Sequence, residues 1–164
     1  MSRILYAAYG SNLHPLRLRE RIPLARLLGS ARLADMTLRF HKRGQDGSGK
    51  CNIIPGAGEV HAAIYALDLP GKLRLHEIEG VGQGYEEQRL HVPGFGECFT
   101  YSATASHIDD ALLPFAWYRQ LVVAGCRYHG FPRAYVARIG RLPAREDPDR
   151  ERVARHSRLV ERVS

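Results

Sequence analysis

The sequence predicts a mixed α+β domain in which a small, partly closed, barrel-like sheet has helices packed outside it. A chain of 164 residues suits one domain that can bury a core without metal or disulfide staples. Strand-like segments come both before and after helix-like ones, with no regular alternation of the two. The strands are short and no internal repeat is visible. We expect a domain over residues 1–142 and a charged C-terminal tail or helix over residues 143–164.

Strand-like patterns dominate the first 67 residues. The apolar run at residues 4–9 indicates the first strand, and an imperfect alternation of apolar and polar residues indicates further ones. The strands expected in this half are residues 4–9, 27–40, 52–54 and 60–67. Residues 13–21 predict a short helix or turn closed by Pro23, and residues 42–50 predict a loop on composition alone.

The second half mixes helices with one pair of strands. A helix opens at Pro70 and runs to Glu79, where three closely spaced glycines stop it. Residues 85–92 and 97–103 resemble an antiparallel pair around a Pro-Gly-Phe-Gly turn. Two more helices are expected, over residues 114–124, ended by Gly125, and more loosely over residues 132–142. Charge dominates after Pro143, so we assign no chemistry to that stretch.

The formal charge of +7 suggests nucleic acid as a partner, but the placement of the charges argues against it. Basic residues crowd residues 17–26 and the stretch after residue 138, and acidic residues or prolines interrupt both. No recognised RNA- or DNA-binding motif accompanies them. We therefore expect no nucleic-acid partner, and attraction of small anionic substrates is the lesser alternative to a solvated surface.

Membrane and secretory features are equally weak. No apolar run approaches the roughly 20 residues needed to cross a bilayer, and residues 1–9 are too short for a signal peptide. These observations predict a cytoplasmic protein with no membrane partner.

Cysteine use agrees with a reducing compartment. Cys51, Cys98 and Cys126 are odd in number, widely spaced and free of any CxxC or Cys/His pattern. We expect them to be reduced and buried as small apolar residues, with no metal bound. A cysteine nucleophile would need a paired histidine, which the sequence does not indicate.

The most informative short segment is the run Tyr-Gly-Ser-Asn-Leu that follows the first strand. Glycine tolerates a positive φ, and serine and asparagine bond to nearby backbone, so the chain is expected to turn sharply here. Such a turn leaves N–H groups without ladder partners, and converging N–H groups form a cradle for an anion or a carbonyl oxygen. A plain loop is the alternative.

Glu79 is the second feature, because it ends a helix pattern between the apolar residues Ile78 and Val81. Desolvation would make this carboxyl group better able to take and return a proton near neutral pH. The alternative is an exposed glutamate at a helix C-terminus. Backbone donors and a carboxylate base together suffice for intramolecular aminolysis of an amide, whereas phosphoryl transfer would need a metal or a lysine-bearing glycine-rich loop.

Four segments in order resemble the gamma-glutamylcyclotransferase family, and the match spans residues 4 to about 139. They are YGSNL after the first strand, DGSGK at residues 46–50, EGVGQGY at residues 79–85, and the stretch from Tyr118 through Gly125 to Pro132 and Tyr135. The resemblance implies a small barrel-like α/β fold with the YGSN turn at the mouth of a polar cavity. It makes Glu79 the catalytic residue. The substrate-binding residues that it implies are Tyr9, Gly10, Ser11, Asn12, Leu13, Tyr85 and Tyr118.

The implied reaction converts a γ-glutamyl amide to 5-oxoproline and a free amino acid or amine, without a cofactor. Members specific for glutathione carry YGSL, so Asn12 favours γ-glutamyl amino acids or γ-glutamylamines without separating them. A non-catalytic relative that binds a glutamyl-like metabolite or a protein partner is the alternative. The chain is expected to be a monomer or a homodimer.

Overall fold

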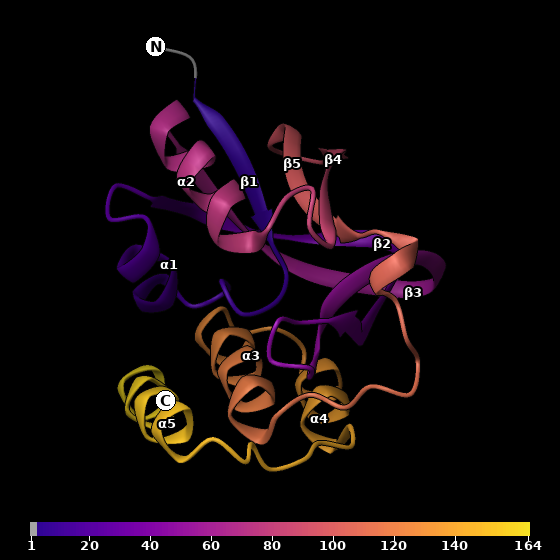
Figure 1. The fold of residues 1–164 in the computed structure, drawn as a ribbon. Coiled ribbons are helices and arrows are strands. Elements are labelled where there is room, and N and C mark those ends of the chain that lie inside the picture. Colours follow the sequence, from indigo (N-terminus) through magenta and orange to yellow (C-terminus); the bar gives the residue numbers. More distant parts are fainter. Residues whose placement is uncertain (1–2) are drawn as a thin grey trace.

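Five strands form one sheet in the order β2-β3-β1-β5-β4 in the computed structural model, which describes residues 3–164 (Figure 1). The strands are β1 (Ile4–Ala8), β2 (Arg26–Arg43), β3 (Gly49–Leu67), β4 (Tyr85–Val92) and β5 (Gly96–Ala103). The central strand β1 runs antiparallel to β3 and parallel to β5. The mixed α+β class is confirmed, and the sheet stays open because β2 and β4 form its two edges.

Five α-helices lie around this sheet within residues 3–164. They are α1 (Pro15–Arg21), α2 (Leu69–Glu79), α3 (Ala116–Tyr128), α4 (Arg133–Arg141) and α5 (Arg150–Val163). A short 3₁₀ helix, η1 (Ala105–His107), follows β5. Helix α2 contacts β5, since His76 Nδ1 lies 2.7 Å from the hydroxyl oxygen of Tyr101 and the ammonium of Lys72 lies 4.8 Å from the ring centre of Phe99. Helices α3, α4 and α5 form a group at the other end of the molecule (Figure 1).

Strands β2 and β3 are longer than the sequence suggests. They pair along one antiparallel ribbon, which begins at the pair Arg26 and Ala66 and ends at the pair Arg43 and Gly49. The two separate strands expected at residues 52–54 and 60–67 are one strand, since Pro55 pairs with Met36 inside the ribbon. At Pro55, β3 lies outside the segment that pairs with β1. The N–H that proline lacks therefore costs no hydrogen bond to a second neighbouring strand. The loop expected at residues 42–50 shrinks accordingly to residues 44–48.

Helix α2 ends where the glycines predict. Gly80 adopts a left-handed conformation with φ of 74°, and the N–H groups of Gly80 and Val81 both donate to the carbonyl of His76. This C-terminal cap satisfies a carbonyl that the helix leaves unpaired, and it fixes the last helical residue, Glu79.

Helix α3 continues through Gly125 to Tyr128, so the expected end at Gly125 is wrong. A Cβ at Gly125 would lie 2.5 Å from Cβ of Leu13 and 3.1 Å from the backbone nitrogen of His14. Glycine is needed here because the chain after β1 packs directly on the helix, and not because the helix stops.

The stretch after Pro143 ends in α5, which packs on α3 rather than extending into solvent. Leu121 and Ala124 of α3 form a small buried cluster with Leu159 and Val163 of α5. The carboxylate of Asp149 caps the helix by accepting from the N–H of Arg152 at 3.0 Å.

Gly125→Ala should destabilise the protein by about 1–3 kcal/mol, because the new methyl group must displace Leu13 and the backbone at His14. Gly140→Ala in α4 is the matched control, since a Cβ there meets open space. The control should be neutral or stabilising by about 0.5–1 kcal/mol. Urea unfolding of both variants checks this, and equal stabilities would contradict the packing argument.

Candidate functional site

The turn after β1 is tight and is held by its neighbours. The N–H of Leu13 donates to the carbonyl of Gly10 at 3.2 Å. Gly10 does not adopt a positive φ, contrary to the expected reason for a glycine at this position. A Cβ at Gly10 would instead lie 2.9 Å from Cβ of Cys51, so the small size of glycine lets the turn approach β3 closely.

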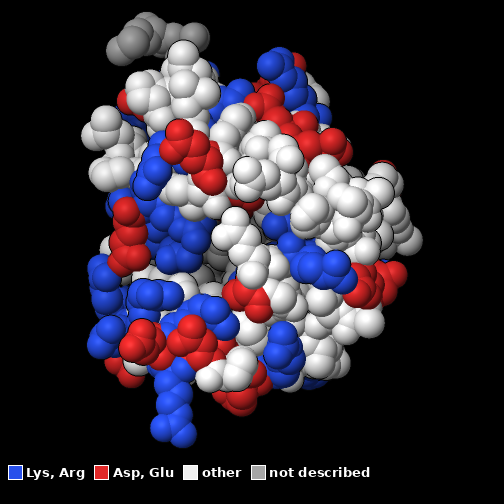
Figure 2. All heavy atoms as spheres, in the orientation of Figure 1, with Lys and Arg blue, Asp and Glu red and all other residues white. Residues whose placement is uncertain are grey.

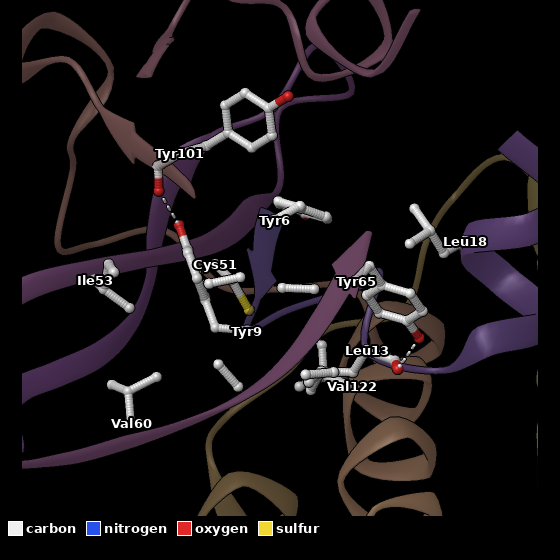
Figure 3. Packing of buried hydrophobic residues seen from close by; sticks show 14 of the residues in the cluster. Tyr6, Tyr9, Leu13, Leu18, Cys51, Ile53, Val60, Tyr65, Tyr101 and Val122 are labelled. Atoms are coloured by element: carbon white, nitrogen blue, oxygen red, sulfur yellow. Dashed lines mark hydrogen bonds between the residues drawn. The ribbon is translucent and has the colours of Figure 1, made fainter. Parts of the chain in front are cut away.

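Two tyrosine hydroxyls fix the ends of the turn (Figure 3). Tyr9 donates to the carbonyl of Tyr101 at 2.6 Å, and Tyr65 donates to the carbonyl of Leu13 at 2.9 Å. The side chain of Leu13 is fully buried in the core, where it anchors the turn, and its expected role in binding substrate stays a prediction. Between these anchors, the N–H groups of Ser11 and Asn12 donate to no protein acceptor within residues 3–164. Both residues line a small inner cavity.

The structure brings the turn to Glu79. Asn12 Nδ2 donates to Oε1 of Glu79 at 2.9 Å, and Arg21 Nη1 lies 3.2 Å from the same oxygen. The surroundings of the carboxylate are therefore polar and cationic, and not the apolar ones expected from Ile78 and Val81.

Asn12 makes three side-chain contacts and is only 3% exposed. Its Nδ2 also donates to the hydroxyl of Tyr6 at 3.1 Å, while its Oδ1 accepts from Arg21 at 3.2 Å. Both ends of its amide are thus used to hold other side chains. Asn12 positions Glu79 and Arg21 rather than presenting a free amide to the cavity.

A small inner cavity of about 30 Å³ adjoins the turn and Glu79. Its lining is rich in tyrosine, with Tyr6, Tyr9, Tyr85, Tyr101 and Tyr118 among the residues that face it. The hydroxyl of Tyr85 donates to the carbonyl of Cys51 at 2.5 Å, whereas that of Tyr118 accepts from the N–H of Cys51 at 3.0 Å. Burial raises the pKa of both tyrosines well above 10, so both are neutral. Tyr118 consequently keeps a hydroxyl proton to donate.

An outer cavity of about 420 Å³ continues from the inner one. Ser11, Glu79, Tyr85 and Tyr118 line both cavities, so the carboxylate lies at their junction. The outer lining is strongly basic, and Figure 2 shows a surface hollowed between basic side chains. Its cations are Arg17, Arg21, Lys42, Lys50 and Arg152. The cavity volume is within the range of about 300–1,000 Å³ that is typical of ligand pockets.

The loop at residues 44–48 lines the outer cavity with Asp46, which is paired internally. Its carboxylate accepts from the N–H of Ser48 at 2.9 Å and from Nζ of Lys50 at 2.9 Å. That ammonium also lies 4.5 Å from the ring centre of Tyr118. The DGSGK segment therefore shapes a wall of the cavity and keeps Lys50 in place.

Helix α5 contributes residues that the sequence reasoning did not assign to the site. Arg152 binds the buried carboxylate of Asp147 through two hydrogen bonds of 2.6 Å, and Trp117 Nε1 donates to the same carboxylate at 2.9 Å. His156 stacks on Trp117 with ring centres 3.7 Å apart. Both Arg152 and His156 line the outer cavity. In the sequence, the apolar residues Leu159 and Val163 stand four positions apart, which is the pattern that indicates one packed face of a helix.

Neither metal ligation nor membrane insertion is indicated by the described part of the chain. Within residues 3–164, no three His, Cys, Asp or Glu side chains gather as a metal site would require. Over the same residues, every helix is too short or too polar to span a bilayer. The three cysteines are free and buried.

Comparison with solved structures supports the fold. A structure described as a gamma-glutamyl cyclotransferase superposes with a TM-score of 0.84 at 24% identity, covering 98% of this chain and 99% of that one. An uncharacterised human protein, loc79017, gives 0.81 at 24% identity and the same coverage. YkqA from Bacillus subtilis gives 0.74 at 19% identity, covering 88% of this chain and 56% of YkqA. No family model and no curated protein matches the chain. The chain therefore has the fold of a gamma-glutamyl cyclotransferase.

His156→Phe should weaken the pH dependence of stability between about pH 4 and 6.5. Burial, followed by the charge of Arg17, lowers the pKa of His156 from 6.5 to about 4. In that window the unfolded chain binds more protons, so stability rises with pH and is lost as pH falls. Phenylalanine keeps the stacking on Trp117 and removes the titration.

Urea unfolding at several pH values measures this effect. The exposed His91→Phe is the control and should keep the wild-type slope. A His156→Phe slope identical to that of the wild type would show that the imidazole titrates alike in both states.

Proposed function

We propose that this protein is a gamma-glutamylcyclotransferase, which converts γ-glutamyl amino acids or γ-glutamylamines to 5-oxoproline and the free amino acid or amine. The observation that carries the proposal is the 2.9 Å hydrogen bond between Asn12 of the turn and Glu79. It places backbone donors and a carboxylate at the same cavity, although 67 positions separate the two residues. The shared fold is consistent with this activity.

The substrate brings its own nucleophile. The α-amine of a γ-glutamyl group can close a five-membered ring on the γ-carbonyl carbon, but near neutral pH this amine is protonated and inert. Glu79 takes the proton from the ammonium, and the freed amine then attacks the carbonyl carbon. Because the reaction is intramolecular, much of the rate comes from holding the glutamyl chain in its curled conformation.

Negative charge develops on the carbonyl oxygen during the attack. The N–H groups of Ser11 and Asn12, which have no protein acceptor within residues 3–164, are the donors proposed to stabilise it. The hydroxyl group of Tyr118, which lines the same cavity, is proposed as a further donor.

Collapse of the tetrahedral intermediate completes the reaction. The bond between the γ-carbon and the departing nitrogen breaks as protonated Glu79 returns its proton to that nitrogen. The attacking nitrogen still carries a second proton, which the freed carboxylate of Glu79 takes up and passes to the released amine, so that 5-oxoproline keeps one N–H and the amine leaves as an ammonium ion. Atoms and charges balance without water, metal or cofactor.

A non-catalytic relative that binds a glutamyl-like metabolite is the second candidate, because a fold does not guarantee activity. The observation that favours it is the pairing of Glu79 with Arg21, since an ion pair can be purely structural. The arrangement at the junction of two cavities favours catalysis, because a structural ion pair has no need of an adjoining space.

Glu79→Gln should lower 5-oxoproline release by about three orders of magnitude, as expected for loss of an essential base. Purified protein is incubated with a panel of γ-glutamyl amino acids and γ-glutamylamines, and 5-oxoproline is measured. Glutamine keeps an oxygen that can accept from Asn12 and Arg21, so the fold should survive.

Glu77→Gln, on the same helix but exposed, is the control and should keep full activity. Full activity of Glu79→Gln would overturn the mechanism. A wild-type protein that releases 5-oxoproline from no member of the panel would favour the binding role instead.

A further inference from the structure

Two cations of the outer cavity have no acidic partner among residues 3–164. Nε of Arg17 is buried and makes no hydrogen bond, and Lys42 forms no ion pair. Lys42 is only 6% exposed, and its ammonium lies 4.3 Å from the ring centre of Tyr85. The other three cations of the lining are each paired: Arg21 with Glu79, Lys50 with Asp46, and Arg152 with Asp147.

Burial makes these unpaired charges costly. It lowers the pKa of Arg17 to about 10, which leaves the guanidinium charged near pH 7, and it also lowers the pKa of Lys42. A buried charge without a partner is destabilising, and a bound anion would offset that cost. His156 adds no charge near pH 7, because its pKa is about 4.

Charge counting indicates what kind of anion fits. Five cations in the lining and three carboxylates paired with them leave a surplus of two positive charges. A γ-glutamyl amino acid with a neutral side chain carries two carboxylates and one ammonium, for a net charge of −1. An acidic side chain on the departing amino acid brings the net charge to −2, which matches the surplus.

The positions of the two cations fit the departing part of the substrate. Arg17 of α1 and Lys42 of β2 line the outer cavity but not the inner one, whereas Glu79 lies at the junction. The α-amine that reacts at Glu79 belongs to the glutamyl group, so the glutamyl group lies at the turn. The departing amino acid then extends toward Arg17 and Lys42.

We infer that the outer cavity is a specificity site for an anionic departing group, in which Arg17 and Lys42 bind the carboxylates of an acidic amino acid. This inference rests on the proposed function and names its substrate class, γ-glutamyl derivatives of acidic amino acids. Carboxylates are held in such sites by charge-assisted hydrogen bonds, which discriminate strongly between a charged group and its neutral isostere.

The test compares γ-glutamyl-glutamate with γ-glutamyl-glutamine, which differ only in the charge of the departing side chain. We expect the wild-type protein to favour γ-glutamyl-glutamate by about tenfold in kcat/KM. Arg17→Met and Lys42→Met, which keep an unbranched aliphatic chain, should each reduce that ratio toward one. The exposed Arg133→Met is the control and should keep the wild-type ratio.

Each outcome decides a separate point. Turnover of both dipeptides with equal kcat/KM, or a ratio that Arg17→Met and Lys42→Met leave unchanged, would overturn the specificity site while the proposed function stands. Absence of turnover with every member of the panel would overturn the proposed function.

If no dipeptide is turned over, calorimetric titration with the same two dipeptides tests whether Arg17 and Lys42 still form an anion-binding site. Tighter binding of γ-glutamyl-glutamate that Arg17→Met weakens would retain it as a binding site. Equal binding of the two dipeptides, or no binding of either, would overturn it.

Discussion

The arrangement of the site depends on the buried amide of Asn12. This one side chain joins three segments, because it donates to Tyr6 of β1 and Glu79 of α2 and accepts from Arg21 of α1. An amide is suited to this position, since it offers donors to a carboxylate and an acceptor to a guanidinium at the same time. A carboxylate there would repel Glu79, and an apolar group would leave buried partners unsatisfied. The turn, the carboxylate and its cation are therefore fixed as a unit.

Packing requirements at two glycines place that unit in the fold. Gly10 lets the turn approach Cys51 of β3, and Gly125 lets α3 approach Leu13. Neither glycine has a positive φ, so both are required by contact and not by backbone conformation. The turn after β1 is thus held against β3 on one side and against α3 on the other, and it cannot shift without opening one of these contacts.

Local signals in the sequence predicted the local elements well. Helix α2 and its glycine cap appeared as expected, as did the pair β4 and β5, because their start and stop signals lie within a few residues. Glu79 and the turn were found as separate features, but their hydrogen bond spans 67 positions and only the fold supplies it.

Contacts between distant segments explain the predictions that failed. Gly125 resembled a helix end, and the cavity residues Arg152 and His156 belong to a tail whose many charged residues concealed its packing on α3.

The positive charge of the cavity has a role in the proposed chemistry beyond binding. A cationic surrounding disfavours the protonated form of an amine, so it would ease removal of the proton from the substrate ammonium. Arg21 lies 3.2 Å from the Glu79 oxygen in the same cavity. The positive field thus prepares the amine before the ring closes, and the developing oxyanion gains from the same field. Pairing of Lys50 with Asp46 and of Arg152 with Asp147 limits the excess charge, so that the fold tolerates the basic cavity without a ligand.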